Sequence, residues 1–110
     1  AAALKAPKDY LLAATIDRVE VVQTGGKQAV RVLGTADANA LKYARIEIGQ
    51  GEAPTNWKQV GTARKNAGPD GILGEIPATA FQGAKVWQIR VLVGHTNGAT
   101  REARLKLNLG

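Results

Sequence analysis

The chain has 110 residues, a length of about one domain that can bury a core of its own without cross-links. It carries 15 Lys plus Arg against 9 Asp plus Glu, which gives a formal charge of +6 at pH 7 that would attract anionic partners. We favour solubility as the role of this charge, because the basic residues are scattered singly. Cysteine and serine are both absent, which excludes disulfides, thiolate metal sites and nucleophilic triads built on either residue.

The N-terminal segment precedes the regular part of the pattern. Residues 1–14 are expected to form a linker, because Pro7 interrupts the apolar residues that would otherwise favour a helix. The first strand is predicted over residues 15–23, which are rich in β-branched side chains. Within it, Ile16 and Val19 fall out of strict alternation, which indicates a β-bulge.

A hairpin and a central strand follow. The adjacent Gly25 and Gly26 predict a tight turn, and a second strand is predicted over residues 28–35. The strand at residues 43–48 then alternates between apolar and polar side chains, the pattern of a strand with one buried face. Its inward residues are Ala44, Ile46 and Ile48, and its outward residues are Tyr43, Arg45 and Glu47.

The rest of the chain repeats short strands between turn signals. The clearest signal is Asn97-Gly98, which is typical of a two-residue hairpin. Glycine- and proline-rich connections are expected at residues 64–71 and 77–84. Four further strands are predicted at residues 57–63, 72–76, 86–93 and 99–109.

Seven short strands without a convincing long helix predict an all-β, seven-stranded antiparallel β-sandwich over residues 15–110. Its two layers are expected to enclose Ile46, Val91 and Leu105. No apolar run approaches the roughly 18 to 20 residues that cross a bilayer, so no membrane span is expected. Methionine is absent, which indicates a processed product or an excised piece of a longer protein.

Several short motifs resemble those of bacterial immunoglobulin-like and fibronectin type III-like modules. One motif begins with Gly-Thr-Ala, continues with an Ile-Glu-Ile-Gly strand and ends in Gly-x-x-Pro-x-x-Trp. A second resembles the Asp-Gly-x-Leu-Gly that follows in those modules, and a third pairs an apolar residue with an aromatic corner residue. They comprise Gly34, Thr35, Ala36, Ile46, Glu47, Ile48, Gly49, Gly51, Pro54 and Trp57, then Asp70, Gly71, Leu73 and Gly74, and finally Phe81, Gly83 and Trp87.

The resemblance covers about residues 15–109 and implies an immunoglobulin-like sandwich. Two positions depart from the pattern. The corner tyrosine is replaced by Trp87, which offers only an indole N–H donor. The tryptophan that the type III family buries on its second strand is replaced by Val30 and Val32, which favours the broader immunoglobulin-like class.

Few residues suggest a metal site. His95 is the only histidine, and its place beside the Asn97-Gly98 turn predicts an exposed turn residue rather than a zinc ligand. The loop oxygens of Asp37, Asn39 and Glu52 are of the kind that weak calcium sites use, although we favour ordinary turn residues. No pair of carboxylates is recognisable as catalytic, so we expect no enzymatic activity, no metal and no cofactor.

The aromatic and basic residues suggest one surface. We expect Trp57 and Trp87 in the core, which leaves Tyr43 as the aromatic residue able to stack on a ligand. The resemblance implies that the central strand and the last two strands share a sheet, whose outward face would then carry a basic stripe. An ordinary solvated face is the alternative that we favour. The residues of this candidate surface for an anionic partner are Tyr43, Arg45, Arg90, Arg104 and Lys106.

The resemblance implies a noncatalytic module of a larger secreted or cell-envelope protein, acting as a spacer, an adhesive unit or an assembly contact. Its partners would be neighbouring domains or protein subunits. The alternative is a polyanion- or glycan-binding accessory domain of a cell-wall or extracellular enzyme, with an anionic polysaccharide or cell-wall polymer as partner. Nucleic acid is not expected as a partner.

Overall fold

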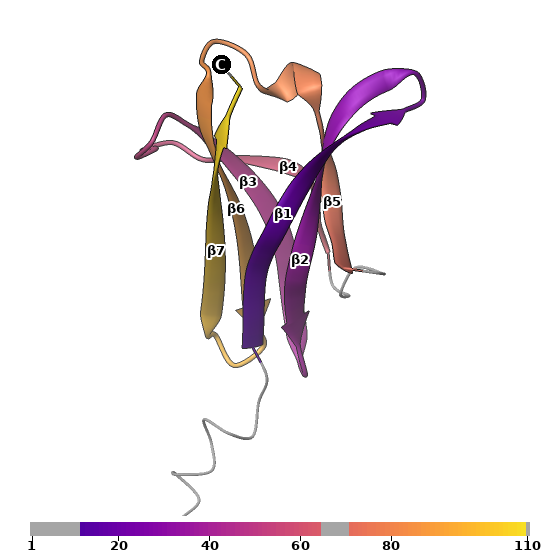
Figure 1. Ribbon diagram of the computed structural model, residues 1–110. Coiled ribbons are helices and arrows are strands. Elements are labelled where there is room, and N and C mark those ends of the chain that lie inside the picture. Colours follow the sequence, from indigo (N-terminus) through magenta and orange to yellow (C-terminus); the bar gives the residue numbers. More distant parts are fainter. Residues whose placement is uncertain (1–11, 65–70, 110) are drawn as a thin grey trace, which may run out of the picture.

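A computed structural model describes residues 12–64 and 71–109. This part of the chain holds seven strands and no α-helix (Figure 1), as the alternation of apolar residues predicts. Residues 1–11 of the expected linker lie outside the described residues, and residues 12–14 are already part of the first strand. The elements are β1 (Leu12–Thr24), β2 (Lys27–Ala38), β3 (Leu41–Gln50), β4 (Lys58–Arg64), β5 (Ile72–Pro77), η3 (Ala78–Ala80), β6 (Val86–His95) and β7 (Thr100–Asn108).

The strands form two antiparallel sheets. Sheet A has the order β1-β2-β5, and sheet B has the order β4-β3-β6-β7. Figure 1 shows the two sheets as facing layers, joined at one end by the segment that runs from β5 through η3 to β6. The central strand and the last two strands therefore share one sheet, as expected.

The core lies between the sheets and consists of the alternating inward side chains. In sheet B, Ile46 pairs with Val91 and Ile48 pairs with Ile89, so four aliphatic side chains form a continuous apolar patch. Sheet A covers this patch with its own inward residues. The largest completely buried side chains are Ile76, Ile89, Val32, Val91 and Val93. Val30 and Val32 stand where the type III family buries a tryptophan, and both are buried here.

Leu105 is a correction to the predicted core. It points inward from β7 but is only half-buried and lies outside the core cluster, whereas Ile46 and Val91 are inside it. The reason is its position on the edge strand of sheet B, which has four strands against the three of sheet A. Figure 1 shows that β1 starts close to β7 and diverges from it toward the β1–β2 hairpin.

The same divergence exposes the end of β1. Val21 pairs with the buried Val30 and therefore shares its face of the sheet, yet 72% of Val21 is exposed. The tip of the β1–β2 hairpin projects beyond the body of the sandwich (Figure 1). The inward face of this hairpin is thus covered by sheet B only along its first part.

The predicted bulge in β1 is confirmed. The pairing of β1 with β2 shifts between Ile16 and Arg18, so one extra residue enters the strand. Beside it, the carbonyl oxygen of Thr15 occupies the space that a β-carbon at Gly34 would need. The backbone N–H of Thr35 donates to the hydroxyl oxygen of Thr15 at 3.0 Å, which locks this approach.

Trp87 lies on the inward face of β6. Its indole N–H donates to the carbonyl oxygen of Ala84 at 3.1 Å, three residues earlier in the chain. Its ring packs edge-to-face on Phe81, with centroids 5.5 Å apart and an interplanar angle of 80°. Trp87 is buried, so the prediction that this tryptophan belongs to the core is confirmed.

His95 corrects a second prediction. It is 6% exposed rather than an exposed turn residue, because β6 continues to His95 and places it on the inward face with Val91 and Val93. Nδ1 accepts the backbone N–H of Asn97 at 3.0 Å, so the ring proton is on Nε2, 2.9 Å from the side-chain oxygen of Asn39. The ring thus connects the β2–β3 turn to the β6–β7 turn.

The difference between Val91 and Leu105 is testable by placing a carboxylate at each. Val91→Asp should cost more than about 4 kcal/mol and unfold the domain, because a charge would replace a fully buried side chain. Leu105→Asp should cost only about 1–2 kcal/mol, since its carboxylate can reach water at the edge. Urea denaturation followed by circular dichroism measures both, and equal losses of stability would contradict this assignment of the core.

Candidate functional site

The outer face of sheet B gathers the surface residues that the sequence singles out. In the register of the sheet, Glu47 is opposite Arg90, and Arg90 is opposite Arg104. Gln88 on β6 is likewise opposite Lys106 on β7. Tyr43 and Arg45 precede Glu47 on β3, so β3, β6 and β7 present all five predicted residues on one face.

The cations on this face are paired with carboxylates. Glu47 is only 7% exposed and accepts a hydrogen bond from Nε of Arg90 at 2.7 Å. Nε of Arg45 lies 3.1 Å from the other oxygen of Glu47, an ion pair without hydrogen-bond alignment. The buried carboxylate of Glu47 thus lies between the guanidinium groups of Arg45 and Arg90. The expected stripe of free positive charge is therefore largely neutralised from within.

Glu102 continues this network on β7. Its carboxylate lies 3.3 Å from Nε of Arg104 and 3.6 Å from a terminal nitrogen of Arg90. Arg90 therefore sits between Glu47 and Glu102 and has a carboxylate on either side. Because the side chain of Arg104 remains 47% exposed, the end of the network near β7 is the part most accessible to solvent.

The loop between β3 and β4 folds back over one end of the outer face. Pro54 fills the space in which Gly49 lacks a side chain. The backbone carbonyl of Glu52 accepts a hydrogen bond from Gln88 at 3.2 Å, and its carboxylate pairs with Lys106. The hydrogen bond from Lys106, aided by its positive charge, lowers the pKa of Glu52 below its ordinary value. The docking of this loop is thus strongest above that pKa and weakens as the pH falls through it.

Trp57 lies at the end of this loop and is not in the core, contrary to prediction. It is half-buried on the outer face, where the guanidinium carbon of Arg90 lies 4.1 Å and that of Arg104 lies 5.0 Å from its ring centroid. These distances are those of cation–π contacts. The return of the loop over the sheet explains the error, because the local pattern around Trp57 does not reveal which face the loop covers.

Tyr43 occupies the other end of the outer face. Its ring lies over Gly94, its neighbour on β6, in the space that a β-carbon at Gly94 would need. Arg45 lies over the same ring, with its guanidinium carbon 5.1 Å from the centroid. Tyr43 is on the outer face as predicted, but its ring is already packed against the protein on one side.

Tyr43 and Gly94 can be tested as a pair. Gly94→Ala should destabilise the domain by about 1–3 kcal/mol, because the new methyl group would collide with the ring of Tyr43. In a Tyr43→Ala background the same change should be neutral or stabilising, since alanine is then the better strand residue. Chemical denaturation of the two single variants and the double variant gives the coupling, and additive effects would refute the contact.

The loop oxygens considered for calcium do not gather. The carboxylate of Asp37 accepts a hydrogen bond from the backbone N–H of Ala38. Asn39 contacts His95 near the start of β3. Glu52 pairs with Lys106 beyond the end of β3, far from the other two. Within residues 12–64 and 71–109, no group of three or more potential ligands could hold a metal ion. The calcium alternative, which the sequence did not favour, therefore has no geometric support among these residues.

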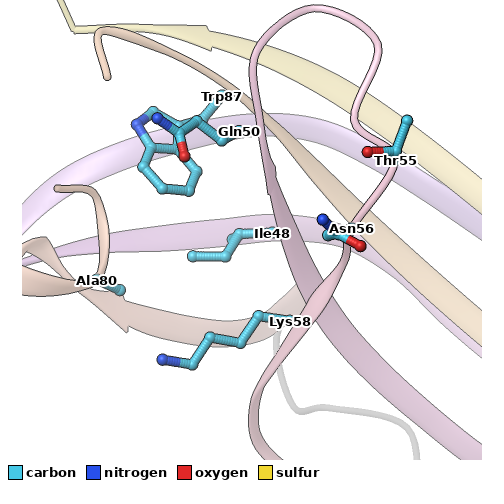
Figure 2. A pocket seen from close by; sticks show the side chains of 7 residues that line it. All are labelled: Ile48, Gln50, Thr55, Asn56, Lys58, Ala80 and Trp87. Carbon is cyan, nitrogen blue, oxygen red and sulfur yellow. The ribbon is translucent and has the colours of Figure 1, made fainter. Parts of the chain in front are cut away.

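A hollow of about 460 Å³ opens beside β4, and sequence reasoning missed it. Ile48 and Trp87 contribute apolar surface, and the exposed residues at its rim are polar (Figure 2). Its members come from three strands, one loop and η3, so no local sequence pattern could have revealed them. The lining residues are Ile48, Gln50, Thr55, Asn56, Lys58, Ala80 and Trp87.

Comparison of the chain with protein-family models, with curated proteins and with solved structures finds no match. In the described part of the chain, no helix is long and apolar enough to span a membrane.

Proposed function

We propose that this chain is a noncatalytic immunoglobulin-like module that holds neighbouring parts of a larger protein at a fixed separation. The observation that carries the proposal is where the described chain begins and ends. β1 starts at one end of the sandwich, whereas the chain after β7 leaves at the other end (Figure 1). Polypeptide joined to both would be separated by the length of the sandwich.

The arrangement of strands supports an immunoglobulin-like class. Three strands face four, and β3 and β6 lie at the centre of the larger sheet. The corner formed by Phe81 and Trp87 adds to this support, because its backward hydrogen bond replaces the one that a corner tyrosine would make. Together with the resembling motifs, these features favour a module of the kind found in secreted and cell-envelope proteins.

The pairing of charges supports a mechanical role over recognition of a polyanion. Arg90 and Arg104 contact Trp57 and carboxylates of the same face, so an anionic ligand would have to displace contacts that already exist. The same contacts connect β3, β6, β7 and the loop after β3, which stiffens the sheet. A stiff sheet suits a spacer or an assembly contact, whose partners would be neighbouring domains or subunits.

The spacer role can be tested with paired spin labels, since the chain has no cysteine of its own. Labels at Ala13→Cys and Leu109→Cys should give one narrow distance distribution near about 35 Å, the rise of a strand of about ten residues. Pulsed electron–electron double resonance measures this distance at low and high salt. A matched pair at Gln23→Cys and Leu109→Cys reports the projecting hairpin. A broad or salt-dependent distance for the first pair would refute the rigid spacer.

The alternative, a polyanion-binding accessory domain, keeps one observation in its favour. The formal charge is +6, and Arg104 and Lys106 remain 47% and 49% exposed. If the outer face does not bind polyanions, Arg90→Ala/Arg104→Ala should elute from heparin at the same salt as Lys42→Ala/Lys85→Ala. Both double variants remove two positive charges. Loss of retention in the arginine variant alone would favour the alternative and count against the spacer.

A further inference from the structure

We propose that the hollow beside β4 binds a hydroxylated carboxylate, the chemical class of a uronic acid unit. This inference goes beyond the proposed spacer role and does not depend on it. The hollow lies where the end of β3, the start of β4, η3 and the start of β6 meet, away from the arginine network of the outer face. Its volume of about 460 Å³ is sufficient for one small ligand.

Two amide groups give the hollow an oriented acceptor and donor. Nε2 of Gln50 donates to the carbonyl oxygen of Gly83 at 3.1 Å, which leaves the side-chain oxygen of Gln50 as an acceptor. Figure 2 shows this oxygen turned toward the hollow, and across from it the side-chain nitrogen of Asn56. An acceptor and a donor that face the same space suit hydroxyl groups, since each hydroxyl both donates and accepts.

Lys58 adds the positive charge. Its side chain extends along the hollow toward Ala80 (Figure 2). Among the described residues no carboxylate forms an ion pair with Lys58, whereas each cation of the arginine network has one. An ammonium at the rim of a hollow that forms no ion pair with the described residues favours an anionic ligand.

The remaining walls narrow the ligand class further. Ile48 and Trp87 are almost completely buried, and the small apolar area that they leave at the inner side of the hollow can contact C–H groups of a sugar ring. A single lysine suits one carboxylate better than a polyphosphate, which proteins hold with several donors or cations. The hydroxyl of Thr55 adds a further donor and acceptor at the rim.

The affinity should be weak. Gln50, Thr55, Asn56 and Lys58 are all exposed, so solvent competes for each polar contact. A dissociation constant in the range of about 1 mM is expected for one ligand unit, and repeated units on a polymer would raise the apparent affinity.

The test is a titration of the folded domain with sodium galacturonate, followed by amide shifts in two-dimensional ¹H–¹⁵N NMR spectra. Saturable shifts should appear at Gln50, Asn56 and Lys58. Galactose, which lacks the carboxylate, and sodium acetate, which lacks the hydroxyls, should each bind at least about tenfold more weakly. Equal shifts with acetate would reduce the hollow to a nonspecific anion contact and overturn the proposal.

Two variants locate the binding. Lys58→Gln keeps the length of the side chain but removes its charge, and it should weaken galacturonate binding at least about fivefold. Lys42→Gln removes a charge from another exposed strand position and should leave binding unchanged. The spectra themselves report whether each variant is folded. Retention of binding in Lys58→Gln, or shifts confined to the outer face of sheet B, would refute the proposed site.

Discussion

Burial of the aliphatic side chains between the two sheets is the interaction on which the rest of the structure depends. Ile89 and Val91 from β6 are covered by Val32 and Ile76 from sheet A, and none of these four side chains is more than 1% exposed. Apolar burial of this extent is the main favourable term in folding. It holds the sheets together, and the polar networks on their outer faces can form only once the strands are in register.

Alternation along the strands explains why the all-β class and the seven antiparallel strands were predictable from the sequence. Residues 43–48 and 87–91 each alternate strictly, and the register of β3 with β6 places their inward apolar residues on one face. Leu105 has the same alternation but only half the burial, because alternation identifies the inward face and not the depth of cover. The divergence of β1 decides how far one sheet extends over the other. No local sequence pattern predicts this divergence.

The candidate surfaces were predictable only in part. The five residues of the expected surface do share a face, because their register follows from the strands. Their pairing with Glu47 and Glu102 depends on which side chains become neighbours across strands, and the position of Trp57 depends on the path of a loop. His95 was misjudged for a similar reason, since its partner Asn39 lies 56 positions earlier in the chain. The hollow combines residues from five elements and has no local signature at all.

The two tryptophans occupy opposite sides of sheet B. Trp87 faces the interior against Phe81, whereas Trp57 is covered by two arginines on the outer face. Their indole rings therefore have different surroundings. Trp87 is in an apolar environment, whereas Trp57 is beside charged groups and partly exposed to solvent. The intrinsic fluorescence of the domain accordingly combines two separate reports, one from the interior and one from the outer face. Replacing one tryptophan with phenylalanine would leave the other as a single fluorescent probe of its own face of sheet B.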